Sequence, residues 1–166
     1  MLPANLTPLE VIDIGIHSET LAYKMYDRLT KRVDVATLQA RLGLLKKDEK
    51  EHRKTLRAHR RAVFGPELGT ATEADAEEIF GTVDVTAVVD RDSLIQALYG
   101  AIRFEEFGAY YYDRQRHKIP NHDARIFFEV LASECRCHAD VIRQQITAVR
   151  SLNLHLDPRG RTIEAL

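Results

Sequence analysis

The stretch from Leu45 to His52 holds two side chains whose types and spacing suit metal binding. Glu49 and His52 stand three residues apart in a segment with helical periodicity. At this spacing a carboxylate and an imidazole share one helix face, about one turn apart, and both can reach one point inside the fold. Similar pairs also occur on solvated helices, so the interpretation depends on the rest of the chain.

A repeat with a constant shift of 86 residues supports the pair. The shift matches Glu19 with Glu105 and His52 with His138. Without a gap it also matches Thr7 with Ser93, Ile16 with Ile102, Ala22 with Gly108, Tyr26 with Tyr112, Asp27 and Arg28 with Asp113 and Arg114, and Leu45 with Leu131. Several matches at chemically particular positions indicate an internal duplication of a helical hairpin.

The elements that must position these residues are four long helices. Apolar periodicity predicts helices over about 7–31, 34–63, 93–117 and 120–152. Thr7, Asp34 and Ser93 are the expected N-caps of the first three, and Pro120 or Asn121 starts the fourth. Residues 65–92 form a long crossover with one or two helical turns near 73–78. The only strand signal lies at 83–89.

Two such hairpins would bring the repeated polar residues together in one interior. Glu19, Glu49, His52, Glu105 and His138 come from all four predicted helices. Burying several carboxylates together without a cation is very unfavourable, because each ion loses hydration and repels the others. A pair of metal ions removes this cost. Carboxylate oxygens with one imidazole per metal suit iron or manganese better than copper or zinc.

On these residues the chain resembles the ferritin-like di-iron superfamily, closest to the rubrerythrin branch, over about 7–152. The matching motif consists of Glu19, Glu105, His138 and the segment 49–52, Glu-Lys-Glu-His. The resemblance implies an all-α, ferritin-like four-helix bundle of two duplicated antiparallel hairpins, with residues 153–166 as a surface or mobile tail. It also implies two iron ions, with manganese as an alternative, and a reaction with hydrogen peroxide or dioxygen.

The resemblance implies a role for each ligand. Glu49 bridges the metals, Glu19 and Glu105 are terminal or shifting carboxylates, and His52 and His138 each bind one metal.

One position departs from the pattern, because Cys135 stands where the repeat and the family require a glutamate. Three interpretations stay open. Glu134, about 40° from His138 on the opposite flank of the helix, serves as the missing carboxylate after a small helix rotation. Alternatively, Cys135 is a thiolate ligand, or the second metal position is weakened or empty.

Other polar and aromatic residues have structural explanations. Tyr26 and Tyr112 are expected to fill the core beside the site, with hydrogen bonding to ligands or electron transfer as the second interpretation. Most basic residues of the second helix are expected to be solvated surface: Lys46, Lys47, Lys50, Arg53, Lys54, Arg57, Arg60 and Arg61.

The charge balance argues against polyanionic partners. Lys plus Arg total 24 against 25 for Asp plus Glu, so no basic excess points to nucleic acid or an anionic membrane. No apolar run approaches the roughly 20 residues of a membrane helix, and the N-terminus lacks the pattern of a signal peptide. We therefore expect a cytoplasmic protein. A homodimer is a separate expectation.

The chain has two cysteines, Cys135 and Cys137. They point about 200° apart on a helix and cannot supply a four-cysteine iron site. We therefore expect no rubredoxin domain of the kind that often accompanies rubrerythrins, and the resemblance then implies an external electron donor protein. Two alternatives to a peroxidase-like redox enzyme are an iron-binding, ferroxidase-type module and a structural bundle with a degenerate metal site.

Overall fold

The computed structural model describes residues 5–33, 35–66, 69–151, 154–156 and 162–164. Its elements in chain order are α1 (Pro8–Arg32), α2 (Ala36–Phe64), α3 (Glu73–Phe80), α4 (Arg91–Gln115), the 3₁₀ turn η1 (Arg116–Lys118), α5 (His122–Arg150), β1 (Leu154–Leu156) and β2 (Thr162–Glu164). The predicted helical fold is confirmed, apart from one short pair of strands. Within the described residues, none of the helices combines the length and apolar character needed to traverse a bilayer.

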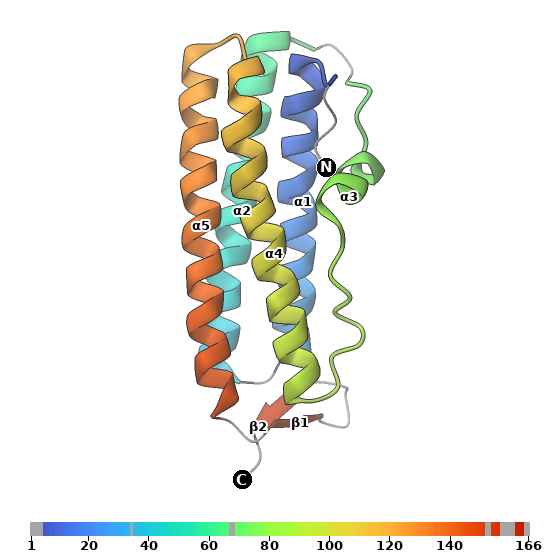
Figure 1. The fold of residues 1–166 in the computed structure, drawn as a ribbon, viewed down its shortest axis with the longest axis vertical. Helices are drawn as coiled ribbons and strands as arrows, with labels where there is room; N and C mark the ends of the chain where they lie inside the picture. The colour runs from blue at the N-terminus through green and yellow to red at the C-terminus, as the bar shows by residue number, and fades with distance from the viewer. Residues whose placement is uncertain (1–4, 34, 67–68, 152–153, 157–161, 165–166) are drawn as a thin grey trace.

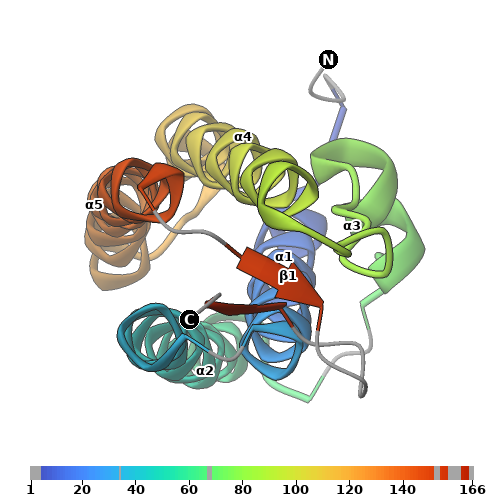
Figure 2. The same ribbon diagram turned by 90° about the horizontal axis from the view of Figure 1, so that it is seen from below.

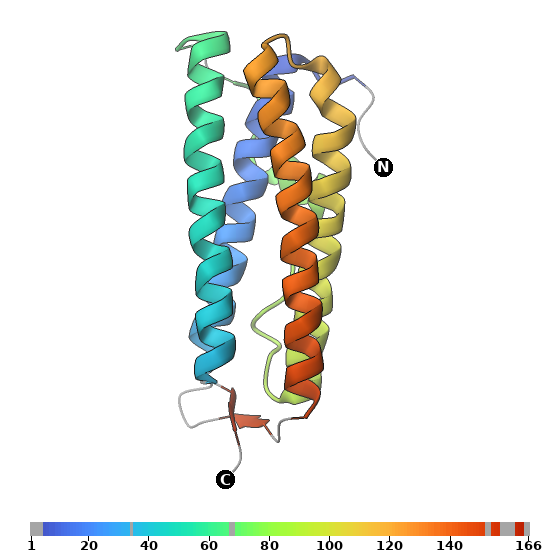
Figure 3. The same cartoon turned by 90° about the vertical axis from the view of Figure 1, so that its left-hand side faces the viewer.

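The four long helices lie side by side along the long axis of the molecule (Figure 1). α1 and α2 run antiparallel, as do α4 and α5, and the view along the axis shows all four around a common interior (Figure 2). The connection from α2 to α4 runs back outside α1 and α4 and carries α3. α2 and α5 therefore form the side of the molecule away from this connection (Figure 3).

The start of α1 is confirmed in detail. The hydroxyl of Thr7 accepts the backbone N–H of Glu10 at 3.3 Å, and the Glu10 carboxylate accepts the backbone N–H of Thr7 at 2.7 Å. Pro8 occupies the first helical turn, where its missing N–H costs nothing. This reciprocal cap fixes where α1 begins and therefore the register of its inward face.

The predicted cap of α4 is wrong by three residues. Asp90, rather than Ser93, is the N-cap, because its carboxylate accepts the Ser93 N–H at 2.8 Å. The Ser93 hydroxyl accepts the Asp90 N–H at 2.9 Å and completes the capping box. Aspartate and serine are both good caps, so the sequence alone did not decide between the two registers.

The other helix ends agree with the sequence more closely. Asn121, one of the two predicted starting residues, is the N-cap of α5, and Gly65 ends α2 with a φ of 65°. Asp34, the predicted cap of α2, lies outside the described residues, and the N-cap of α2 is Val35, without a side-chain hydrogen bond. α3 lies where one or two helical turns were predicted.

The predicted strand signal is wrong. Residues 83–89 form no strand, and their valines Val85 and Val88 are buried in an irregular segment. The strands instead pair antiparallel in the tail, with Leu154 opposite Glu164 and Leu156 opposite Thr162. Strands of three residues are too short to show the alternation by which a strand is recognised in sequence.

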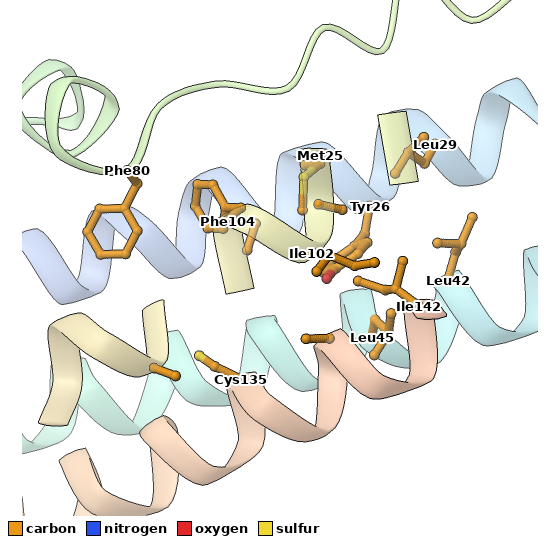
Figure 4. Packing of buried hydrophobic residues seen from close by; sticks show 14 of the residues in the cluster. Met25, Tyr26, Leu29, Leu42, Leu45, Phe80, Ile102, Phe104, Cys135 and Ile142 are labelled. Atoms are coloured by element: carbon orange, nitrogen blue, oxygen red, sulfur yellow. The ribbon is translucent and has the colours of Figure 1, made fainter. Parts of the chain in front are cut away.

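The interior between the helices is mainly apolar. Figure 4 shows side chains from the long helices meeting there, including Tyr26, Leu42, Ile102 and Ile142. α3 is attached through Phe80, whose ring centroid lies 5.4 Å from that of Phe104. The buried polar side chains of the described residues are Asp13, Ser18, Glu19, Glu49, Glu105, Gln115 and His138. Four of these seven were predicted as metal ligands, so the polar exceptions coincide with the candidate site.

Candidate metal centre

Each long helix contributes at least one predicted ligand to the interior. Glu19 comes from α1, Glu49 and His52 from α2, Glu105 from α4 and His138 from α5. The three glutamates and His138 are at most 3% exposed, and the His52 side chain is 13% exposed. The structure thus brings five of the seven predicted residues into one buried cluster.

Glu19, Glu49 and His52 form the first of two groups within this cluster. His52 Nδ1 lies 3.1 Å from Oε2 of Glu19 and 3.4 Å from Oε2 of Glu49. Glu49 and His52 are three residues apart on one face of α2, as the sequence predicted. Their donor atoms converge closely enough for a single ion to contact all three side chains.

Glu49, Glu105 and His138 form the second group. His138 Nδ1 lies 2.8 Å from Oε1 of Glu49 and 3.7 Å from Oε1 of Glu105. The rings of His52 and His138 are nearly parallel, with centroids 5.7 Å apart. Glu49 therefore belongs to both groups and turns a different oxygen towards each imidazole.

Two atoms at the heart of the second group lack a hydrogen-bond partner. Glu49 Oε1 and His138 Nδ1 are only 2.8 Å apart, but they are not oriented so that a hydrogen bond forms between them. Neither atom has another hydrogen-bond partner. Leaving such buried polar atoms unpaired is costly. A metal ion would accept lone pairs from both, so the donor set fits a cation.

The charge of the cluster depends on which of its carboxyl groups and imidazoles are protonated. Burial, reinforced by the charges of Glu19 and Glu105, raises the pKa of Glu49 to about 8. Burial lowers the pKa of His52 and His138, but contacts with the surrounding carboxylates outweigh it and raise these values to about 10 and about 11. At neutral pH the metal-free protein therefore holds protons where a metal would bind, and metal binding must displace them.

Two tyrosines connect the cluster across the two helix pairs. The hydroxyl of Tyr26 on α1 donates to Oε1 of Glu105 on α4 at 2.5 Å. The hydroxyl of Tyr112 on α4 donates to Oε1 of Glu19 on α1 and also lies 3.1 Å from the Ser18 hydroxyl. The expectation from the sequence was that both residues simply fill the core. Both are buried as expected, and both also hold a candidate ligand.

Cys135 lies in the interior of α5 but in neither group. Burial and then the charge of Glu105 raise the pKa of its thiol well above the ordinary value. Its Sγ lies only 3.1 Å from the position that a Cβ at residue 108 would occupy. The thiol therefore fills space left by Gly108, close to Glu105.

Glu134 is half-buried and also lies outside both groups. Its equivalent under the 86-residue shift is Asp48 on α2. Oδ2 of Asp48 lies 3.6 Å from Nε2 of His138, on the side of the ring away from the cluster. Asp48 was not among the predicted site residues, although its place directly before Glu49 and its match with Glu134 were available signals. At this distance the two atoms do not form a hydrogen bond, and Nε2 of His138 has no other partner.

Comparisons with known proteins add information on the fold. No family model and no curated protein matches this sequence. The structure is similar to that of a hypothetical protein from Pyrococcus furiosus, with a TM-score of 0.72, 17% sequence identity, and coverage of 89% of this chain and 92% of that chain. At this identity the similarity concerns the helical fold alone.

Proposed function

We propose that this protein is a dinuclear iron protein of the rubrerythrin type that reduces hydrogen peroxide or dioxygen. The observation that carries the proposal is the shared position of Glu49, whose two oxygens face two imidazoles that stand 5.7 Å apart. A single ion needs only one such group. Two groups joined by one carboxylate are the arrangement expected for a pair of ions.

The proposal includes a ferritin-like four-helix bundle built from two duplicated hairpins. α2 and α5 have the same length, 29 residues, and start 86 residues apart, which is the shift that relates the polar residues. α1 and α4 also share a length, 25 residues. A duplicated hairpin explains why Glu19 and Glu105, and likewise His52 and His138, occupy equivalent places.

The donor set favours iron, with manganese as the alternative. Each group offers two carboxylates and one imidazole, and hard oxygen donors with a single nitrogen suit these metals. A bound pair of redox-active ions would supply the two electrons that, with two protons, convert one hydrogen peroxide into two waters.

The chain's own residues would prepare the site for this chemistry. Glu49 would join the two ions, and His52 and His138 would bind one each through Nδ1. The hydroxyls of Tyr26 and Tyr112 would orient the carboxylates of Glu105 and Glu19. The apolar surroundings keep bulk water from the reacting atoms and strengthen these electrostatic contacts.

Metal content tests the proposal directly. Metal-free protein is incubated anaerobically with ferrous iron, freed of excess metal, and analysed for iron per chain. We expect about two ions per chain and oxidation of both when one equivalent of peroxide is added. Fewer than one iron or manganese ion per chain would contradict the proposal.

A second candidate function is iron handling, in which the bundle binds and oxidises iron for storage or delivery. The cysteine content favours it, because Cys135 and Cys137 cannot form an electron-transfer centre, and oxidation of iron by dioxygen needs no donor protein. Sedimentation separates the two functions, since storage requires a large shell, whereas a homodimer agrees with the redox function.

A further inference from the structure

Five basic side chains form a line on the outer face of α2. Lys47, Lys50, Lys54, Arg57 and Arg61 are all exposed. They follow one another at intervals of three or four residues, so they share one helix face over about 21 Å. We call these five residues the α2 basic stripe.

Most of the stripe has no counter-charge. Lys54 lies 3.5 Å from a carboxylate oxygen of Glu51. Within the described part of the chain, the side chains of Lys47, Lys50, Arg57 and Arg61 make no ion pair or hydrogen bond. Like charges one helical turn apart are mildly destabilising, so the stripe does not serve the stability of the isolated protein.

The stripe borders a shallow hollow that a partner could enter. Lys54, Arg57 and Arg61 line it together with Ala58 and Ala62. Both alanines are exposed, and their short side chains let another surface approach the helix between the cations. The feature therefore combines positive charge with room for contact.

The stripe lies on the same helix as the candidate metal centre. Lys50 directly follows Glu49 in the sequence, and the stripe occupies the face of α2 opposite Glu49 and His52. An α-helix with its side chains is about 10–12 Å thick. A partner bound to the stripe would thus be separated from the centre by a single helix, α2, which itself lies on the side of the molecule away from the crossover (Figure 3).

The charge distribution indicates a small acidic partner. α2 carries nine basic and three acidic residues, whereas the whole chain has a net charge of −1, so the rest of the molecule is acidic. A long nucleic acid or a flat anionic membrane would extend past the stripe onto α5, which carries four acidic and four basic residues and offers no net attraction. A small acidic protein can confine its contact to the stripe and gain the electrostatic attraction.

We propose that the α2 basic stripe docks a small acidic electron-carrier protein that reduces the metal centre. This inference rests on the proposed redox function. In each encounter the reduced carrier would lose one electron, and a metal pair held by Glu19, Glu49, His52, Glu105 and His138 would accept it. Two encounters therefore supply the two electrons that reduction of one hydrogen peroxide to two waters requires, and the two protons come from solvent.

The test uses a reduced plant-type [2Fe–2S] ferredoxin as the probe. Its oxidation by iron-loaded, oxidised protein is followed by stopped-flow absorbance in wild type and in the triple variant Lys50→Glu, Lys54→Glu, Arg57→Glu. We expect the second-order rate constant to fall at least about tenfold in the variant, and the wild-type rate to fall with added salt.

A matched control changes the same net charge elsewhere. Arg28, Arg103 and Arg114 are exposed on α1 and α4, and their replacement by glutamate should change the rate less than about twofold once salt screens long-range effects. Equal losses in both triple variants would overturn the docking site. Thermal melts establish that each variant is folded. Replacing the same three stripe residues by glutamine should lower the rate constant less than replacing them by glutamate.

Two further measurements separate this inference from the proposed function. If dithionite cannot reduce the iron-loaded wild-type protein, the redox function fails. Calorimetric titration of metal-free protein with oxidised ferredoxin tests docking independently of metal. The absence of salt-sensitive binding in this titration would refute the docking site. Tighter binding of duplex DNA or phosphatidylserine vesicles than of ferredoxin would also refute it.

Discussion

At the scale of single residues, Glu49 is the position where a small change has the largest expected effect. We predict that Glu49→Gln lowers metal content from about two ions per chain to less than one, because the exchange removes a donor from both groups. Glu51→Gln, two residues away and exposed, is the matched control and should keep full metal content. The measurement is elemental analysis after anaerobic loading and gel filtration.

The same variant distinguishes a real metal site from a decayed one. In the metal-free state Glu49→Gln should unfold at the same or a higher temperature than wild type, because it replaces a buried carboxyl group, which is repelled by the neighbouring carboxylates, with an uncharged amide. In the iron-loaded state it should unfold at a lower temperature than wild type. Unchanged metal content together with increased stability would mean that the bundle is only structural.

A second residue-scale prediction concerns the open question on α5. Glu134 lies outside both groups, so Glu134→Gln should leave the number of bound ions unchanged, whereas Glu105→Gln should lose about one ion per chain. Loss of an ion in Glu134→Gln would instead support the interpretation of Glu134 as the missing carboxylate. Both variants are compared by metal content and by the optical spectrum of the iron-loaded protein.

The residues of the candidate site were easier to predict from the sequence than the side chains that contact them. Spacing and the repeat were sufficient to select Glu49 and His52, because residues three apart must share a helix face. The hydrogen bond from Tyr112 to Glu19 could not be deduced in this way, because it depends on how α4 is rotated and shifted against α1. Asp48 was overlooked since an exposed aspartate beside lysines resembles ordinary helix surface.

At the scale of elements, the spacing of α4 and α5 depends on Gly108. A Cβ at this position would lie 3.1 Å from Sγ of Cys135, whereas a Cβ at Gly43 on α2 would meet nothing within 4 Å. We predict that Gly43→Ala stabilises the protein by about 0.5–1 kcal/mol through helix propensity. Gly108→Ala should instead be neutral or destabilising, because crowding of a packed core typically costs about 1–3 kcal/mol.

Urea unfolding of the metal-free proteins measures both effects. Replacing Cys135 by alanine in the Gly108→Ala protein should recover part of the loss, since it removes the atom that is crowded. Equal stabilisation by the two glycine substitutions would show that α4 and α5 are free to move apart.

The elements also show where local sequence patterns fail. The bounds of α1 followed from a complete capping box, but Asp90 and Ser93 could each cap α4, and only the contacts of the folded chain decide between them. β1 and β2 have three residues each, which is too short for periodicity to be visible. Long amphipathic helices were thus predictable, while caps and short strands depended on tertiary contacts.

At the scale of the whole molecule, metal-free stability should depend strongly on pH. His52 and His138 have pKa values raised from 6.5 to about 10 and about 11, so the folded state retains protons that the unfolded chain releases above pH 6.5. Glu49, raised from 4.5 to about 8, acts in the same direction. The free energy of unfolding should therefore fall as the pH rises from about 6.5 towards 10.

Denaturant titrations of the metal-free protein at several pH values measure this dependence. The iron-loaded protein is the comparison, because ligands that bind metal hold no protons and its stability should change less over the same range. A metal-free protein that became more stable between pH 7 and 9 would contradict the assigned protonation of the cluster.

The shared carboxylate would make two metal positions unequal in their dependence on folding. The first group, Glu19, Glu49 and His52, lies entirely within the α1–α2 hairpin, whereas the second draws Glu49 from that hairpin and Glu105 and His138 from the other. Cys135, at the position equivalent to Glu49, provides no carboxylate in return. One ion would thus be bound by residues of a single hairpin. The other would bind only after the two hairpins have packed together, and its binding would stabilise that packing.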